Sequence, residues 1–192
     1  MPDAGRVVAG TARGIRLTAP GEGTRPLGDR VKQTLFAILG PSIRGARVLD
    51  LFAGSGAAGI EALSRGAALA VLVERDREAV RTIERNLERT RLADGARIVR
   101  AEALTWLARE GPPVHPWDIA IVDPPYSEPA LLERALTVLS APSLMAADGW
   151  VVAKHFWRTD LPARIGLLAS QRQRRFGETS LTFYRVTDQE AT

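Results

Sequence analysis

Hydrophobic and polar positions along the chain form a regular succession of strand-like and helix-like segments. Short apolar runs, typical of buried strands, are separated by segments in which apolar residues recur with the helical period. The runs that predict strands of a main sheet are residues 47–51, 68–74, 96–101, 118–122, 150–153, 166–175 and 178–186. The segments that predict helices are residues 29–39, 57–65, 76–92, a shorter one ending near 109, and 129–139.

This alternation predicts an α/β fold of Rossmann-like type, with a seven-stranded, mostly parallel sheet and helices on both faces. Residues 166–186 contain two strand-like runs about a glycine turn, so we expect a C-terminal antiparallel hairpin. Two shorter runs, 6–10 and 15–18, predict a small N-terminal β-hairpin. We therefore expect a hairpin extension over residues 1–22 and a larger domain over residues 23–192.

The composition agrees with this picture and removes several kinds of chemistry. A chain of 192 residues that is 45% hydrophobic suits one domain with a small appendage and a proper core. The absence of cysteine excludes disulfides and thiol nucleophiles, and the two histidines lie far apart, so we expect no metal site. No stretch approaches the ~20 apolar residues of a membrane span, and the N-terminus has no apolar segment after a basic start, so we expect no secretion. We expect a cytoplasmic, soluble monomer that binds no membrane.

The net charge of +4 is unevenly distributed. Residues 1–47 carry eight Lys or Arg against three Asp or Glu, and residues 154–185 carry seven against two. The middle of the chain has a slight excess of acids. Two basic flanks around an acidic centre indicate a polyanionic partner such as a nucleic acid. The alternative is an ordinary solvated basic surface.

The segment Asp-Pro-Pro-Tyr at 123–126 directly follows the apolar run 118–122, at the end of a predicted strand. The two prolines fix φ and donate no hydrogen bond, and the second keeps the first extended, so the turn is stiff. This corner presents the Asp123 carboxylate, backbone carbonyls and the Tyr126 ring. Such groups suit an amino group on a planar heterocycle. The alternative is a simple turn with the tyrosine packed over it.

A glycine-rich loop follows the first strand of the predicted sheet and opens a helix. Gly54, Gly56 and Gly59 obey the pattern G-x-G-x-x-G, and Glu74 ends the next strand. Glycines permit a tight turn with close backbone approach, and an acid on the second strand accepts ribose hydroxyls. The loop therefore predicts a site for an adenosine-containing cofactor, unless the glycines serve only helix–strand packing. The residues that we expect to contact this cofactor are Asp50, Phe52, Ala53, Gly54, Ser55, Gly56, Glu74 and Glu102.

Two cofactors compete for this loop. A dinucleotide would place its pyrophosphate at the helix N-terminus. S-adenosylmethionine has no phosphate, and Asp50 is placed to receive its ammonium group. Glu102 could accept from the adenine amino group, or it could be a first-turn acid stabilised by the helix dipole. The corner at 123–126 favours S-adenosylmethionine, because a methyltransferase acting on an exocyclic amine uses such a corner and a dehydrogenase does not.

With these residues the chain resembles the bacterial 16S rRNA guanine-N2 methyltransferases. The segments that carry the resemblance are residues 6–10, 24–26, 29–31, 36, 48–56, 61–67, 74, 123–126 and 176–179. The glycine loop and the corner are shared by many amino-methyltransferases. The occurrence of both Thr-Arg-Pro at 24–26 and Asp-Arg-Val at 29–31 is what points to this family. The chain departs from the family pattern at Leu27, usually threonine, at Glu102, commonly aspartate, and at Lys154, where the family usually has an acid.

The resemblance implies transfer of a methyl group from S-adenosylmethionine to the exocyclic N2 amino group of a guanine in 16S rRNA or in the assembling small subunit. It gives catalytic roles to Asp123 and the Pro124 carbonyl, as acceptors of the amino hydrogens, and to Tyr126, which stacks on the base. The arginines expected to bind RNA phosphates are Arg13, Arg16, Arg25 and Arg30. Arg25 could instead pair with a carboxylate, and Arg30 could lie on a solvated helix face. Two other functions stay open: an adenine-N6 methyltransferase acting on DNA or RNA, and a non-catalytic RNA-binding protein.

Overall fold

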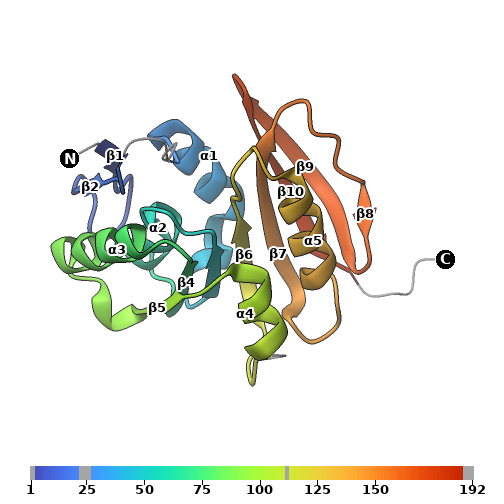
Figure 1. Ribbon diagram of the computed structural model, residues 1–192, viewed down its shortest axis with the longest axis horizontal. Coiled ribbons are helices and arrows are strands. Elements are labelled where there is room, and N and C mark those ends of the chain that lie inside the picture. The colour runs from blue at the N-terminus through green and yellow to red at the C-terminus, as the bar shows by residue number, and fades with distance from the viewer. Residues whose placement is uncertain (1–2, 22–26, 111–112, 188–192) are drawn as a thin grey trace. The chain divides into compact units, whose positions relative to one another are not determined.

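The structure, a computed structural model, describes residues 3–21, 27–110 and 113–187. The chain forms two compact units, residues 1–103 and residues 104–192. Strands and helices alternate along it in the order expected of an α/β fold (Figure 1). The boundary between the units lies after residue 103, and the division into a 1–22 extension and a 23–192 domain stays a prediction.

The first unit contains three parallel strands in the order β5-β4-β3. The strands are β3 (Arg47–Leu51), β4 (Leu69–Glu74) and β5 (Ala96–Arg100), and the helices are α1 (Asp29–Leu39), α2 (Ala57–Ser64) and α3 (Arg77–Thr90), with 3-10 turns Gly40–Ile43 and Ala93–Gly95. The central strand β4 is apolar up to its last residue, as expected for a strand covered on both faces. Helix α3 is strongly amphipathic and buries only one stripe, which is typical of a helix lying on a sheet.

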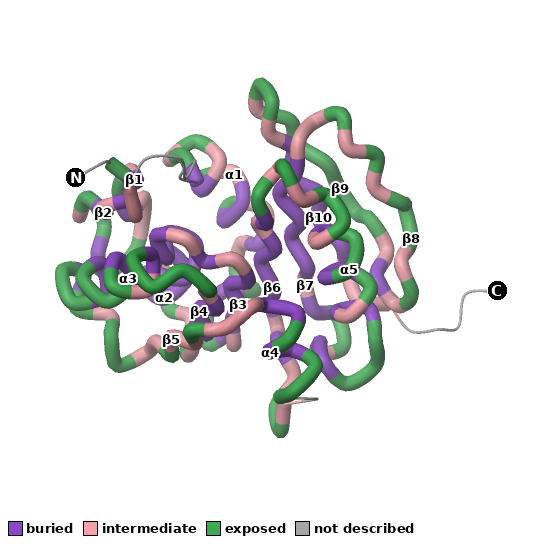
Figure 2. The backbone as a smooth tube through the Cα atoms, in the orientation of Figure 1, coloured by how far each residue is buried: buried purple, intermediate pink, exposed green. Residues whose placement is uncertain are grey.

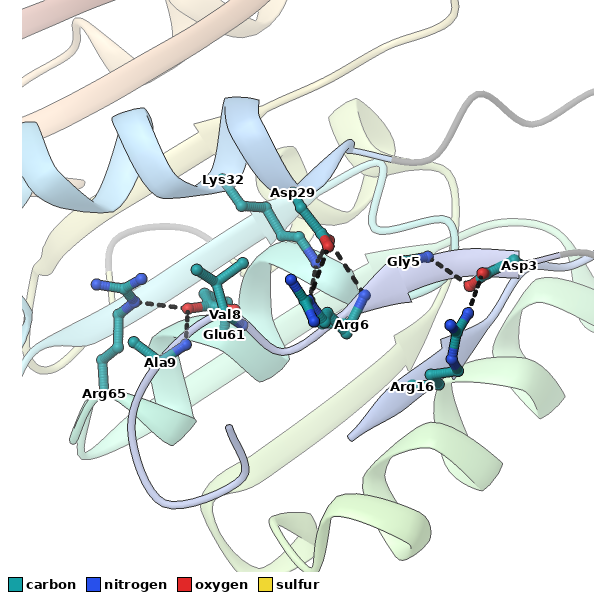
Figure 3. Close-up of polar contacts among 10 residues, drawn as sticks. All are labelled: Asp3, Gly5, Arg6, Val8, Ala9, Arg16, Asp29, Lys32, Glu61 and Arg65. Atoms are coloured by element: carbon teal, nitrogen blue, oxygen red, sulfur yellow. Dashed lines mark hydrogen bonds and ion pairs between the residues drawn. The ribbon is translucent and has the colours of Figure 1, made fainter. Parts of the chain in front are cut away.

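The N-terminal hairpin is present, but its first strand lies earlier than predicted. Strand β1 spans Asp3–Arg6 and pairs antiparallel with β2 (Arg16–Thr18). The Val7 amide still donates across the hairpin, to the Ile15 carbonyl at 2.9 Å, but the next two amides turn to a carboxylate of α2: those of Val8 and Ala9 donate to Glu61 at 2.7 and 3.0 Å (Figure 3). The prediction of a strand over residues 6–10 was therefore wrong in its bounds, because β1 ends at Arg6.

Ser64 of α2 also holds the hairpin: its carbonyl accepts from the Thr11 amide at 2.8 Å and its hydroxyl from the Ala12 amide at 3.0 Å. A Cβ at Gly10, which has φ +85°, would lie 1.7 Å from the Ser64 carbonyl oxygen, so only glycine fits there. The buried Glu61 is itself held by Arg65, whose Nε donates to it at 2.6 Å. The hairpin is thus packed onto the first unit rather than extended from it.

Helix α1 has the predicted bounds. Gly28 occupies the N-cap position and provides no side-chain cap, whereas Asp29 is the first helical residue. The Asp29 carboxylate accepts from the Arg6 amide at 3.1 Å and pairs with Lys32 at 3.3 Å (Figure 3). Burial raises the pKa of Asp29, but these partners outweigh it and bring the pKa below its usual value.

The second unit contains five strands in the order β6-β7-β10-β9-β8. They are β6 (Trp117–Val122), β7 (Met145–Phe156), β8 (Arg164–Ile165), β9 (Leu168–Phe176) and β10 (Thr179–Val186); the helices are α4 (Ala103–Glu110) and α5 (Pro129–Leu139). Strands β6 and β7 are parallel, and the remaining neighbours are antiparallel. The C-terminal hairpin is confirmed.

The sheet strands number eight in the described ranges, not the predicted seven. The additional strand is β8, which has two residues and is too short to show any periodicity. Strand β7 is also longer than the predicted run 150–153. The run was predicted to begin at Trp150 because Asp148 and Gly149 interrupt the apolar pattern before it. Strands β10 and β9 differ in burial: the centre of β10 is buried, whereas β9 is exposed from Ser170 to Arg175 (Figure 2).

Candidate active site

The glycine loop lies in the first unit, between β3 and α2. Three of its residues have positive φ: Phe52 (+66°), Gly54 (+56°) and Gly56 (+76°). Phe52 is the exception among them, since a residue with a side chain rarely adopts this conformation and such strain is found mainly at functional sites. Ala53 holds the loop against the sheet, because its amide donates to the Val73 carbonyl at 3.0 Å.

Glu74 fixes the outer edge of this loop. One carboxylate oxygen accepts from the Gly54 amide and the other from the Asp76 amide, both at 2.8 Å. A carboxylate has about four acceptor positions, so Glu74 keeps capacity for further donors. A Cβ on Gly54 would meet no atom within 4 Å, which means that the space beside the loop is open there. This arrangement fits the ribose of an adenosine-containing ligand.

Gly56 and Gly59 have a packing role as well. A Cβ on Gly56 would lie 3.1 Å from the Leu72 side chain, and one on Gly59 would lie 2.9 Å from it. These glycines therefore let α2 approach β4 closely. The alternative that the glycines serve packing is correct for these two positions, while the open side of Gly54 is not explained by packing.

Asp50 and Glu102 occupy strand ends in the same unit. The Asp50 carboxylate is buried, and its Oδ2 accepts from the Gly59 amide at 2.9 Å. One of its oxygens thus orients the first turn of α2. Glu102 lies half-buried after β5 and directly before α4. Its position agrees equally with a ligand contact and with a first-turn acid on α4.

Asn86 is a residue of this region that sequence reasoning missed. Its side chain is fully buried on α3, and its Nδ2 donates to the carbonyls of Ser55 and Thr18, each at 2.9 Å. Its Oδ1 accepts from the amide and the hydroxyl of Thr18 at 2.9 and 3.0 Å. Asn86 thereby ties the glycine loop to the N-terminal hairpin. The only sequence signal was an asparagine on the apolar stripe of an amphipathic helix.

The corner at 123–126 lies in the second unit, where β6 ends. Pro124 is buried, while the Asp123 side chain is 22% exposed. Both Asp123 oxygens accept from Lys154 Nζ on the neighbouring strand β7, at 2.6 and 2.8 Å. Lys154 was singled out only as a departure from the family pattern, and the structure makes it the partner of the predicted catalytic carboxylate.

The electrostatics of this pair are set by burial and by the ammonium. Burial raises the pKa of Asp123, and the charge and hydrogen bonds of Lys154 oppose that rise. A charge-assisted, two-point contact of this kind also fixes the orientation of the carboxylate. Lys154 therefore both aims the carboxylate and helps to keep it ionised.

Tyr126 closes the corner with its ring. Its hydroxyl lies 2.8 Å from the Thr179 hydroxyl on β10, and Lys154 Nζ lies 5.1 Å from its ring centroid. The rings of Tyr126 and Phe156 lie 6.3 Å apart at an angle of 56°. The ring is half-exposed and held at one end, which suits stacking on a flat ligand.

The predicted phosphate-binding arginines have different surroundings. Arg13 and Arg30 are exposed. Arg16 is exposed too, but it pairs with Asp3 at 2.7 Å across the hairpin, which reduces its free charge (Figure 3). Arg25 lies outside the described residues.

The described ranges 3–21, 27–110 and 113–187 contain neither a candidate metal site nor a candidate membrane span. In them no group of three or more His, Asp or Glu side chains is arranged to hold a metal ion. In the same ranges no helix combines the length and apolar character needed to cross a bilayer.

Comparison with known proteins places the chain in a family. The model of the family described as "Conserved hypothetical protein 95" matches residues 5–185. The ribosomal RNA small subunit methyltransferase D of Escherichia coli (strain K12) is 37% identical over 181 residues, covering 94% of this chain and 89% of that protein. That of Haemophilus influenzae is 38% identical over 136 residues, covering 70% of this chain and 69% of that protein.

Solved structures agree with the sequence comparisons. A structure of an Escherichia coli protein is 35% identical with a TM-score of 0.85, covering 96% of this chain and 98% of that one. A Salinibacter ruber RNA methyltransferase in complex with S-adenosyl-L-homocysteine, 14% identical with a TM-score of 0.65, covers 88% of this chain and 97% of that one and shares the fold. The chain thus belongs to the family represented by the ribosomal RNA small subunit methyltransferase D.

Proposed function

We propose that this protein transfers a methyl group from S-adenosylmethionine to the exocyclic N2 amino group of a guanine in 16S rRNA. The observation that carries the proposal is the Asp123 carboxylate at the end of β6, oriented by Lys154 beside the half-exposed Tyr126 ring. It stands in a chain of a family whose named relatives are ribosomal RNA methyltransferases. We assign 16S rRNA, free or in an assembling small subunit, as the partner.

The glycine loop suits the methyl donor. Glu74 has acceptor capacity for ribose hydroxyls, and the open side of Gly54 leaves room for the nucleoside. The loop presents backbone amides together with the carboxylates of Asp50 and Glu74, a set that suits the nucleoside and the ammonium group of S-adenosylmethionine. The Salinibacter ruber neighbour holds the demethylated product of this cofactor. We assign Asp50, Phe52, Ala53, Ser55, Gly56 and Glu102 to the same site.

Asp123 acts on the acceptor nitrogen. The guanine N2 lone pair is delocalised into the ring, so the amino group is a poor nucleophile. When the Asp123 carboxylate and the Pro124 carbonyl accept its two N–H bonds, the lone pair is localised and aimed. S-adenosylmethionine would supply the methyl group as an electrophilic sulfonium and leave as S-adenosylhomocysteine, and the nitrogen would give up one proton to Asp123 or to water. Most of the acceleration is positioning, with electrostatic support from Asp123 as positive charge develops on nitrogen.

Tyr126 holds the base. An enzyme that modifies a base inside a structured nucleic acid takes that base out of its stack. The Tyr126 ring, fixed by the Thr179 hydroxyl, offers one flat face for it. Base–aromatic stacking contributes about 1–3 kcal/mol.

The basic residues of the N-terminal segment supply affinity. Arg13 and Arg30 are exposed, and Arg16 shares its charge with Asp3. Together with Arg25 they are assigned to RNA phosphates. Phosphate contacts supply sequence-independent affinity that falls with salt.

The test offers the protein and labelled S-adenosylmethionine three substrates in turn: naked 16S rRNA, assembled small subunits and duplex DNA. The modified nucleoside is then mapped. We expect label in rRNA as N2-methylguanine, and none after Asp123→Ala, which should bind the cofactor with unchanged affinity. If the label is recovered as N6-methyladenine, the acceptor base is adenine and not guanine. Label transfer by Asp123→Ala at the wild-type rate would remove the role given to this carboxylate.

A further inference from the structure

Three side chains of the second unit form a compact cationic group around one indole. The guanidinium carbon of Arg175, on β9, lies 3.7 Å from the Trp157 ring centroid, and that of Arg158 lies 4.8 Å from it. Trp157 is half-buried, whereas both arginines are exposed. We call Trp157, Arg158 and Arg175 the Trp157 cluster.

The backbone fixes the indole at this place. Trp157 follows the last residue of β7, and its amide donates to the Glu178 carbonyl in the β9–β10 turn at 3.0 Å. Arg175 Nε donates to the Gly177 carbonyl of that turn at 2.9 Å. The cluster is therefore anchored where β7 ends and at the β9–β10 turn.

The cluster is continuous with the proposed catalytic corner. Phe156 lies between them: its ring centroid is 6.3 Å from that of Tyr126 and 6.1 Å from that of Trp157. A row of three aromatic rings thus leads from the base-holding ring to the two guanidinium groups. All of these residues belong to the second unit.

Charge complementarity identifies the occupant. In the described ranges, the Trp157 indole and the Gly177 carbonyl that hold Arg158 and Arg175 are neutral, so these contacts do not cancel the two positive charges. The nearest acids along the chain are Asp160 and Glu178, both exposed. Arg175 uses one of its five N–H donors in the bond to the Gly177 carbonyl. Two like charges held on one ring repel each other, and a bound phosphate would relieve this repulsion.

We propose that the Trp157 cluster binds the phosphates of the single-stranded RNA segment adjoining the target base. The identity of the RNA rests on the proposed function, whereas the phosphate binding rests on the cluster itself. The indole lies against both guanidinium groups, whose carbons are 3.7 and 4.8 Å from its ring centroid, and the donors that the fold does not use are available to phosphate oxygens. Arginine is suited to this because its planar fork matches phosphate oxygens in two-point contacts.

The experiment measures binding of a short single-stranded oligouridylate as a function of salt, and methyl transfer to a 16S rRNA transcript, for the same set of proteins. The set is wild type, the double variant Arg158→Ala with Arg175→Ala, Trp157→Ala, Trp157→Phe, and the control Arg134→Ala. Arg134 is an exposed arginine of α5 in the same unit. Thermal melting and S-adenosylmethionine binding verify that each variant is folded.

For the double variant we expect oligouridylate affinity to fall about 25-fold at about 0.1 M salt. The salt slope should decrease by about 0.7 for each phosphate that the variant no longer neutralises. Trp157→Ala should resemble the double variant, Trp157→Phe should retain most of the affinity, and Arg134→Ala should keep the wild-type slope. In methyl transfer the effect should appear as a higher KM for RNA with kcat unchanged.

An unchanged salt slope in the double variant, or no oligouridylate binding by wild type, overturns the inference. Wild type that transfers no methyl group to rRNA, while its oligouridylate binding still depends on the cluster, contradicts the proposed function and supports the phosphate site. Wild type that methylates rRNA with a KM independent of both arginines supports the function and overturns the cluster's role.

Discussion

Lys154 Nζ lies 2.6 Å and 2.8 Å from the two carboxylate oxygens of Asp123, although the two residues are 31 positions apart in sequence. The register of the sheet brings them together: Val122 at the end of β6 pairs with Ala153 on the parallel strand β7, and each residue of interest follows next in its chain. The Asp123 carboxylate, to which we assign binding of the amino group, is therefore paired with the Lys154 ammonium.

Replacing Lys154 should change the pH dependence of methyl transfer. In Lys154→Gln the ammonium no longer opposes the effect of burial, so the pKa of Asp123 rises further. The carboxylate is then protonated at higher pH, and the acidic limb of the kcat profile moves upward in pH. Lys154→Arg keeps the charge and serves as the control. Superimposable acidic limbs for Lys154→Gln and wild type would contradict the assignment.

Tyr126 should act through its ring more than through its hydroxyl. Tyr126→Ala loses the stacking partner, and we expect kcat/KM for RNA to fall by about 10- to 100-fold. Tyr126→Phe loses only the bond to Thr179 and should fall far less. Thr179→Val removes the same bond from the other side and should match Tyr126→Phe. Equal losses for the Phe and Ala variants would show that the hydroxyl, not stacking, matters.

Glu74 should support cofactor affinity by holding the glycine loop. Glu74→Ala leaves the amides of Gly54 and Asp76 without their carboxylate partner and removes the acceptor for the ribose. We expect S-adenosylmethionine to bind roughly 30-fold more weakly, equivalent to about 2 kcal/mol, measured by calorimetry. Glu74→Gln, which keeps one acceptor oxygen, should be intermediate. Wild-type affinity in Glu74→Ala would remove this residue from the site.

Asn86 should contribute to stability well beyond an exposed residue of α3. Asn86→Ala removes four hydrogen bonds to Thr18 and Ser55 in a fully buried position. We expect the free energy of unfolding to fall by at least about 2 kcal/mol. The exposed Arg85 on the same helix gives a matched control, since Arg85→Ala should change it by less than about 0.5 kcal/mol. Similar melting curves for the two variants would refute this expectation.

His155 should make stability depend on pH. Burial lowers its pKa from 6.5, and the ring nitrogens lie 2.9 Å from the Thr182 hydroxyl and 2.9 Å from the Phe156 carbonyl. The unfolded chain therefore binds a proton more readily than the folded one. The contribution of His155 is complete above pH 6.5 and is lost as the pH falls below it.

Denaturant titrations at several pH values test this. His155→Gln should lose part of the decline in stability below pH 6.5, whereas replacement of the exposed His115 by Gln should leave it as in wild type. If His155→Gln shows the same decline in stability below pH 6.5 as wild type, the decline is caused by other groups.

Local sequence patterns determined the types of elements and their order. Apolar runs, helical periodicity, the glycines after β3 and the prolines after β6 all act within a few residues, so they can be read without the tertiary structure. The positions of the glycine loop and of the corner at 123–126 were predicted on this basis. Strand β8 was missed because two residues contain no period.

The partners of these elements were decided only by the tertiary structure. The Lys154–Asp123 pair follows from the register of β6 and β7, the course of residues 8 and 9 from the Glu61 carboxylate, and the Arg175–Trp157 contact from the β9–β10 turn. Each joins residues far apart in sequence, and hydrogen-bond and charge partners depend on spatial neighbours rather than on local periodicity. The sequence alone therefore located the carboxylate of the corner, while folding determined the cation that holds it.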